Sequence, residues 1–240
     1  MKNLITIFLT LAALVSVNAQ RGKKVKGNGN VVTIERTTGD YDGLRVGGFY
    51  EVKLVEGTEG KITLSGEDNL LKYIETEVKG GTLTIKSRDN MQLKISNGER
   101  ILITIPVEEI DAIRLSGSGK LYTTTTLKAD SFKVHTSGAR NAELLLNVNS
   151  LKIVSSGSSN IKLGGSTEKL NITSSGSSSL NAYDLKATDA EITSSGSSDI
   201  RLAVTDVLRT KSSGSSNIRY RGNPSKEYAK TTGSSSVSRQ

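Results

Sequence analysis

The 240-residue chain contains no cysteine, one histidine and two prolines. The absence of cysteine excludes disulfides and thiolate chemistry, so packing and hydrogen bonds alone must stabilise the fold. The single histidine, His135, has no further histidine, cysteine or carboxylate cluster in register with it that would complete a metal site. We therefore expect neither a metal nor a cofactor.

A long apolar run occurs only at the N-terminus, where Lys2 precedes "LITIFLTLAALVSV" and "VNA" ends at Ala19. This order of basic, apolar and small residues is typical of a cleaved secretory signal, and the run is short for a membrane span. We expect residues 1–19 to be a signal peptide, and the rest of the chain to carry no membrane span and no lipid on a cysteine. The protein would then be exported to the periplasm, the cell surface or the medium.

The charge balance is basic, with 32 Lys and Arg against 24 Asp and Glu. An acidic polysaccharide, an anionic surface or a nucleic acid would suit such a balance, and export argues against nucleic acid. The alternative is that the charge serves only solubility.

Serine and glycine runs recur along the second half of the chain, as in "SSGSSNI", "SSGSSSL" and "SSGSSDI". Their glycines are spaced by 21, 19, 19, 20, 18 and 19 residues, a regularity that indicates a solenoid and not a set of linkers. The seven glycines, which we interpret as structural corners, are Gly117, Gly138, Gly157, Gly176, Gly196, Gly214 and Gly233.

Apolar residues alternate with polar ones on both sides of each glycine, for example Ile172 four residues before Gly176 and Leu180 four residues after it. Each unit therefore reads as strand, tight corner, strand. A unit of about 19 residues cannot close a sheet with itself, and must pair with the units above and below. The sequence predicts an all-β parallel β-helix, with larger coils at its N-terminal end.

The same alternation directs the serines two residues before and after each glycine toward the inside of the corner, where only small side chains fit. The first column holds Ser155, Ser174, Ser194 and Ser212, and the second holds Ser159, Ser178, Ser198 and Ser216. We expect a basic lead-in at residues 20–35 and a single domain at residues 36–237. The larger N-terminal coils would cap the stack, whereas the last corner, at Gly233, leaves an open coil.

The chain resembles the head GIN domain family, also called putative auto-transporter adhesins. The resemblance rests on "GNGNVVTIERTTGDYDGLRVGGFYEVKLVEG", "NLLKYIETEVKGGTLTIK", "LSGSGKL" and the serial "SSGSS" corners, and it covers about residues 28–222. It implies an exported or envelope protein with a β-helical fold, an adhesive role and no catalytic motif. We therefore expect a non-enzymatic surface or envelope module with an adhesive or structural role.

The outward side chains offer one candidate binding surface. Lys162, Arg201 and Arg219 fall at equivalent positions of the repeat, and the pattern suggests Lys152, Arg209 and Lys211 as their neighbours. Such a basic ladder suits an acidic polysaccharide or another envelope component, although outward charges also serve to keep a flat sheet soluble.

Three other interpretations remain. Many parallel β-helices degrade polysaccharides, but the outward column three residues after the glycine holds a single acid, Asp199, whereas such chemistry needs positioned carboxylates. The open last coil could support self-association, end to end, into a polymer. "GSGK" at 117–120 lacks the upstream glycine and the Ser or Thr of a phosphate loop, and the repeat explains it without a nucleotide.

Overall fold

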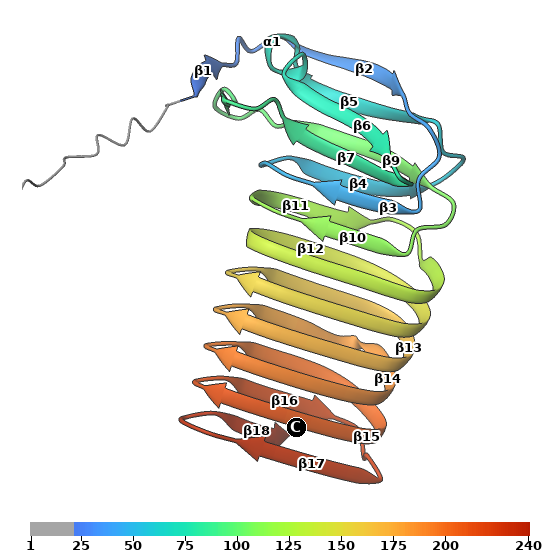
Figure 1. The fold of residues 1–240 in the computed structure, drawn as a ribbon, viewed down its shortest axis with the longest axis vertical. Coiled ribbons are helices and arrows are strands. Elements are labelled where there is room, and N and C mark those ends of the chain that lie inside the picture. The colour runs from blue at the N-terminus through green and yellow to red at the C-terminus, as the bar shows by residue number, and fades with distance from the viewer. Residues whose placement is uncertain (1–21) are drawn as a thin grey trace, which may run out of the picture.

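The computed structural model describes residues 22–240, and most of them lie in strands. Figure 1 shows a tall stack of coils, from the N-terminal residues in blue to the C-terminal residues in red. The predicted all-β parallel β-helix with larger N-terminal coils is confirmed. The signal peptide expected at residues 1–19 lies outside the described residues.

The regular part of the stack consists of long strands that pair in parallel, each with the next along the chain. These strands are β12 (Leu127–Gly157), β13 (Asn160–Gly176), β14 (Ser179–Gly196) and β15 (Asp199–Gly214), and the last coils are formed by β16 (Asn217–Arg221), β17 (Lys226–Thr231) and β18 (Ser236–Arg239). The register shifts by one repeat per coil, so Gly157 pairs with Gly176 and Gly196 with Gly214. Inward and outward residues alternate along the strands, so apolar side chains fill the inside of the coils from β12 to β15.

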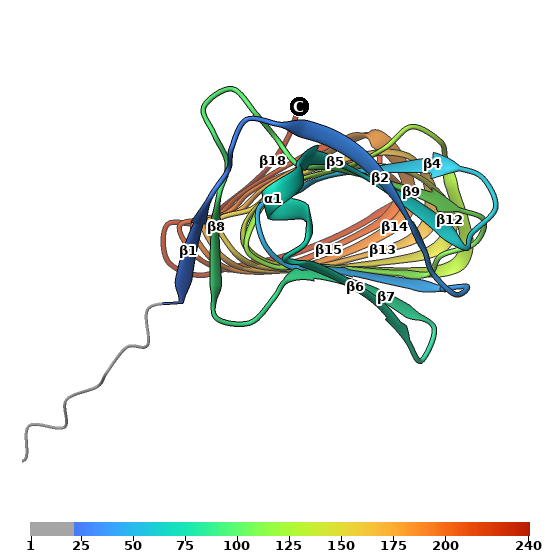
Figure 2. The same ribbon diagram turned by 90° about the horizontal axis from the view of Figure 1, so that it is seen from above.

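Each coil is flattened, with two sheets facing each other across the core, as the view along the stack shows (Figure 2). We call the sheet segments that lead to each glycine the pre-corner wall, and those that follow it the post-corner wall. The pre-corner wall begins with β3 (Gly43–Val46) and β10 (Ala112–Leu115), and the post-corner wall with β4 (Glu51–Glu56) and β11 (Ser118–Thr123). In Figure 1 the arrowheads of β12 to β15 end at the glycine corner.

The N-terminal end departs from the parallel pattern. It contains β2 (Val31–Thr37), β5 (Lys61–Glu67), β6 (Ile74–Lys79), β7 (Thr82–Ser87), β9 (Leu102–Val107) and the short helix α1 (Asp68–Leu71). Antiparallel pairs join β2 to β5, β5 to β9 and β6 to β7. Within residues 22–240, no helix has the length and apolar character needed to cross a membrane.

The segment expected to be a basic lead-in, residues 20–35, contributes β1 (Lys23–Lys26) and the first part of β2. β1 pairs with β8 (Met91–Lys94) in a separate two-stranded sheet. The buried carboxylate of Glu67 links both strands to the stack, because it accepts hydrogen bonds from the backbone of Gly29 (2.7 Å) and of Ser96 (3.0 Å) and from the Ser96 hydroxyl (2.7 Å).

The seven repeat glycines stack on one another at the corner. Their φ angles lie between +74° and +110°, a region that side chains disfavour. A Cβ atom on any of them would lie 2.5 to 2.7 Å from the carbonyl oxygen of the glycine one coil above. Gly48 begins this column, since a Cβ on Gly117 would meet its carbonyl oxygen.

Both predicted serine columns point into the corner and are buried. The hydroxyls of Ser174 and Ser178 lie 2.6 Å apart across one coil, and Ser174 also contacts Ser198 of the next coil at 2.8 Å. Thr136 occupies the first column one coil earlier and bonds to Ser155 and Ser159, both at 3.1 Å. Most of the hydroxyls therefore satisfy one another at a bend too tight for larger side chains, while the buried Ser212 hydroxyl has no hydrogen-bond partner among residues 22–240.

Arg140 replaces serine in the second column and is fully buried. Its guanidinium donates hydrogen bonds to the carbonyl oxygens of Ser116 (3.1 Å), Tyr50 (3.1 Å) and Val46 (3.5 Å). The residue above it in the column is Gly119, where a Cβ would lie 2.8 Å from the guanidinium. The arginine thus fills the corner where the head coils meet the regular repeat, and the repeat pattern did not predict it.

The last described coil is more polar inside than the coils above it. Glu227 of β17 lies below Leu208, Ala229 below Thr210 and Thr231 below Ser212. The Tyr220 hydroxyl donates a hydrogen bond to Glu227 (2.7 Å). The inward column of large apolar residues therefore ends in a carboxylate at β17, a feature that the sequence pattern had not revealed.

Candidate binding surfaces on the two walls

The predicted basic ladder lies in one outward column of the post-corner wall. Lys162 pairs in register with Asn181, Asn181 with Arg201, and Arg201 with Arg219. Coils are about 4.8 Å apart, so the two arginines are neighbours and Lys162 lies two coils above Arg201. The structure brings the three side chains into one column, with an uncharged residue between the lysine and the arginines.

Carboxylates neutralise much of this column. Asp199 is within 3.2 Å of Arg201 and 2.9 Å of Arg219; Arg201 contacts both of its carboxylate oxygens, and Arg219 donates to Oδ2. The Lys162 ammonium lies 4.0 Å from Asp184. One coil above Lys162, Glu143 pairs with Lys120 at 3.3 Å. The ladder therefore presents alternating charges to the solvent and not a uniform positive field.

The predicted neighbours of this ladder lie elsewhere. Lys152, Arg209 and Lys211 precede their glycines and belong to the pre-corner wall. That wall is on the other side of the apolar core, so these residues cannot join Lys162, Arg201 and Arg219 in one stripe. The prediction was wrong on this point because the chain reverses at the glycine corner, which places residues on either side of it on opposite surfaces.

The pre-corner wall carries most of its basic residues in two outward columns. One column contains Lys133, Lys152 and Arg209, and the other contains Arg45, Arg114, His135, Lys211 and Lys230. His135 lies directly below Arg114 and points outward, away from the core. In the part of the chain that the structure describes, no group of three or more His, Cys, Asp or Glu side chains is arranged to hold a metal ion.

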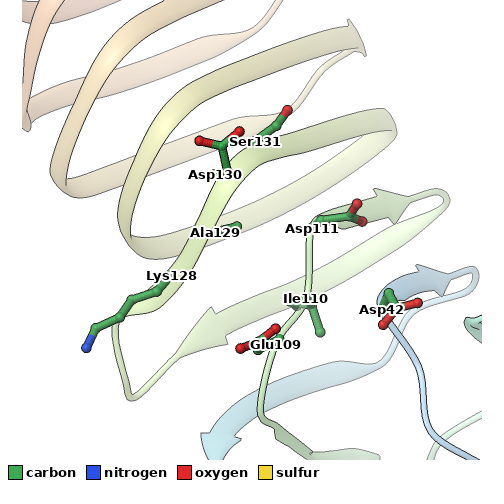
Figure 3. A pocket seen from close by; sticks show the side chains of 8 residues that line it. All are labelled: Asp42, Glu109, Ile110, Asp111, Lys128, Ala129, Asp130 and Ser131. Carbon is green, nitrogen blue, oxygen red and sulfur yellow. The ribbon is translucent and has the colours of Figure 1, made fainter.

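A hollow of about 410 Å³ lies where the pre-corner wall begins, lined by Asp42, Glu109, Asp111 and Asp130 together with Lys128 (Figure 3). In Figure 3, Glu109 and Asp111 lie on one segment, whereas Asp42 and Asp130 come from two others, and the four carboxylates do not converge on one point. Asp130 accepts a hydrogen bond from the Asn149 side chain (2.7 Å). The hollow is acidic, and its geometry does not provide a metal site.

The remaining motifs have structural roles. Gly117 and Gly119 of "GSGK" turn the corner with positive φ, and Lys120 forms an ion pair with Glu143 on the post-corner wall. Asp199, the acid weighed as a catalytic residue, is engaged with two arginines. Asp199 therefore serves as the ion-pair partner of Arg201 and Arg219 on the post-corner wall.

Known structures share this fold. A protein from Bacteroides fragilis described as a putative adhesin superposes with a TM-score of 0.82 at 21% identity, covering 90% of this chain and 100% of its own. A protein from Parabacteroides distasonis described as a putative lipid binding protein gives a TM-score of 0.66 at 24% identity, covering 91% of this chain and 100% of its own. A putative adhesin from Parabacteroides merdae gives 0.67 at 19% identity, covering 90% and 99%.

The comparison with curated proteins found no match. The family model described as "Putative auto-transporter adhesin, head GIN domain" matches residues 40–224, which is most of the chain. This match confirms the resemblance seen in the corner motifs. The chain belongs to the putative auto-transporter adhesin, head GIN domain, family.

Proposed function

We propose that this protein is an exported, non-catalytic module that adheres to a component of the cell envelope or of a neighbouring surface. The family supports an adhesin-like role in general terms. The observation that carries the proposal is the construction of the walls: outward side chains stand in columns on a stack of coils with a continuous apolar core. Such columns repeat about every 4.8 Å and present a regular surface to an extended ligand.

Acidic polysaccharide binding along Lys162, Arg201 and Arg219 is one form of this proposal. The column has the correct geometry, but Asp184 and Asp199 offset its charge. Paired charges at a surface contribute little net attraction for a distant anion. We therefore base the proposal on adhesion by the walls as a whole and not on this column alone.

Export is tested by removing the expected signal peptide. The full chain and a variant lacking residues 2–19 would be expressed in the native host, and envelope, periplasmic and medium fractions probed for the protein. We expect the full chain outside the cytoplasm and the shortened chain inside it. Retention of both in the cytoplasm would contradict export.

Adhesion would be measured in two assays on residues 20–240. The soluble protein would be applied to a glycan array, and beads that carry the protein would be used for pull-down from envelope fractions. We expect retention on at least one envelope component, with no release of reducing ends or unsaturated products from acidic polysaccharides. Product release that is lost on Asp199→Asn would instead indicate an enzyme. A failure to be retained on any component would overturn the adhesive role.

A further inference from the structure

The two walls differ in charge at equivalent positions. On the pre-corner wall we consider the columns five and three residues before the glycine, and on the post-corner wall the columns three and five residues after it. The pre-corner columns carry the basic residues Arg45, Arg114, Lys133, Lys152, Arg209, Lys211 and Lys230 and the acidic residue Glu191. The post-corner columns carry the basic residues Lys53, Lys120, Lys162, Arg201 and Arg219 and the acidic residues Glu51, Glu143 and Asp199.

The pairing of these charges differs even more. Lys120, Lys162, Arg201 and Arg219 of the post-corner wall each have a carboxylate within 4.0 Å. Across residues 22–240, the ion pairs involve none of the seven basic residues in the pre-corner columns. Like charges on neighbouring strands repel one another, so an array of seven basic residues with one acidic residue, Glu191, favours an anionic ligand.

We infer that the pre-corner columns form a binding strip for a linear polysaccharide that carries carboxylate or sulfate groups, an inference that rests on the adhesive function proposed above. At the upper end, Arg45, Arg114 and His135 occupy three successive coils. Arg114, Lys133, His135 and Lys152 line a shallow hollow of about 150 Å³ there. Charges one coil apart are separated by about 4.8 Å, and charges two residues apart on a strand by about 6.7 Å.

The lower end of the strip adds an aromatic surface. Arg209, Lys211, Tyr228 and Lys230 line a second hollow, of about 320 Å³, together with Glu191. The Tyr228 side chain is 54% exposed, and the Arg209 guanidinium lies 5.3 Å from the centre of its ring. An exposed ring beside basic groups provides an apolar face for a sugar ring and donors for its acidic substituent.

The residues between the two ends suit a sugar polymer. Asn171, Thr173 and Thr193 occupy the columns in the middle coils, beside Val154 and the single carboxylate of Glu191, and offer uncharged amide and hydroxyl groups. From Arg45 to Lys230 the strip crosses seven coil spacings, or about 34 Å. A chain several sugar units long could therefore contact both basic ends and use these polar groups in between.

Other anionic partners fit less well. A flat anionic membrane would also press against the acidic hollow formed by Asp42, Glu109, Asp111 and Asp130 beside the upper end of the strip. Single-stranded nucleic acid relies on several aromatic side chains that stack with successive bases, and Tyr228 is the only aromatic residue in the pre-corner columns from β3 to β17. The strip is narrow and bordered by carboxylates, which favours a single polymer chain.

The test compares two variants of residues 20–240 that lose the same charge from opposite walls. The first replaces Arg114, Lys133, Arg209 and Lys211 by Gln, and the second replaces Lys120, Lys162, Arg201 and Arg219 by Gln. Binding to polygalacturonate, dextran sulfate and neutral dextran would be measured by calorimetry at two salt concentrations. Circular dichroism and thermal melting would establish that both variants are folded, which we expect because all eight side chains lie on the outer surface.

We expect wild-type protein to bind at least one of the two acidic polymers, in a salt-sensitive manner, and not to bind neutral dextran. The pre-corner variant should bind about tenfold more weakly or worse, and the post-corner variant should lose less than about threefold. Equal losses in both variants, or a loss only in the post-corner variant, would overturn the strip. If wild-type protein binds neither acidic polymer but is still retained on envelope components, the strip fails and the adhesive function stands. If it is retained on nothing, both fail.

Discussion

At the residue scale, the corner glycines show how one side chain decides whether a coil can stack. Each glycine has a positive φ, and the carbonyl oxygen of the glycine in the preceding coil lies against the position that a Cβ would occupy. The first property disfavours any side chain, and the second excludes even a methyl group unless the backbone moves. The serines beside the glycine are small for the same reason, and hydroxyls such as those of Ser174, Ser178 and Ser198 are satisfied by one another.

Gly176→Ala should lower the free energy of unfolding by about 4 kcal/mol. The new side chain is strained at φ +110°, and its Cβ would lie 2.6 Å from the Gly157 carbonyl oxygen, which is a steric clash. Gly80→Ala is the matched control, since Gly80 also has positive φ (+55°) but has no atom within 4 Å of the added Cβ. The control should cost about 1 kcal/mol. Urea unfolding of both variants would measure this, and equal costs would show that the stacking contact is unimportant.

Arg140 tests whether a buried charge or a filled volume holds the junction corner. Burial lowers the pKa of Arg140 to about 10, opposed by the nearby Tyr50, so the charged form is disfavoured inside the corner. Three backbone hydrogen bonds offset that cost. We expect Arg140→Met, which keeps most of the volume, to change the free energy of unfolding by less than about 1 kcal/mol, and Arg140→Ala to lower it by about 3 kcal/mol.

Chemical denaturation of both Arg140 variants provides the measurement. Arg114→Met serves as the control, because Arg114 is exposed on the pre-corner wall and its replacement should have an effect within about 0.5 kcal/mol. If Arg140→Met proves as destabilising as Arg140→Ala, the hydrogen bonds to the carbonyl oxygens and not the volume hold the corner.

At the scale of elements, the strands of the regular coils hold one another through an unbroken parallel register, whereas β1 and β8 depend on a few polar contacts. Glu67 is the main link, and it acts from the end of β5 on the backbone before β2 and on the loop after β8. Local opening should therefore begin in this two-stranded sheet, which packs against little of the core.

The stabilising effect of Glu67 should depend on pH. Burial by itself raises the pKa of Glu67, but the hydrogen bonds from Ser96 and Gly29 outweigh it and leave the pKa below its ordinary value. A folded-state pKa below the unfolded one stabilises the protein above the unfolded pKa of about 4.3, and this contribution is lost as the pH falls through the folded value.

Melting temperatures of wild type and Glu67→Gln would be compared from pH 7 to pH 3. The difference should be constant above about pH 5 and should shrink below about pH 4. Glu35→Gln is the control, because Glu35 forms just one ion pair, with Lys61 at 3.8 Å, and both side chains are exposed. This substitution should change the melting temperature little at any pH. A Glu67→Gln difference that does not change with pH would contradict this role.

At the scale of the whole molecule, a stack of coils extends as long as each coil offers an apolar inner face and free backbone groups to the next. At β17 the inward column changes from Leu208 to Glu227. An inward carboxylate is costly to bury against another apolar coil, so it opposes end-to-end association at this edge. We therefore expect residues 20–240 to remain monomeric.

Glu227→Leu combined with Ala229→Ile would restore the apolar inner face of β17 and should cause concentration-dependent association in sedimentation velocity experiments. The matched control, Tyr228→Leu combined with Lys230→Ile, adds similar side chains to the outer surface of the same strand. Filaments of the wild-type protein would show that the polar inner face does not limit stacking. If only the control variant associates, the association would arise from the outer surface of the pre-corner wall and not from the inner face of β17.

The sequence by itself determined the fold class, the corners and the direction of the serines, because a glycine every 18 to 21 residues with alternating flanks is compatible with a parallel β-helix and with little else. It also showed the family through the same motifs. These features are local, and local periodicity is readable in one chain.

Only the tertiary structure decided which basic residues share a surface. Arg219 and Asp199 are 20 residues apart and meet because adjacent coils are in register, whereas Lys152 and Lys162 are 10 residues apart and lie on opposite walls. The buried Arg140 and the space left for it by Gly119 also depend on contacts between coils. The sequence repeat predicts the path of the backbone. Which wall a charged side chain lies on, and which charge it pairs with, depends on where the chain reverses in the folded structure.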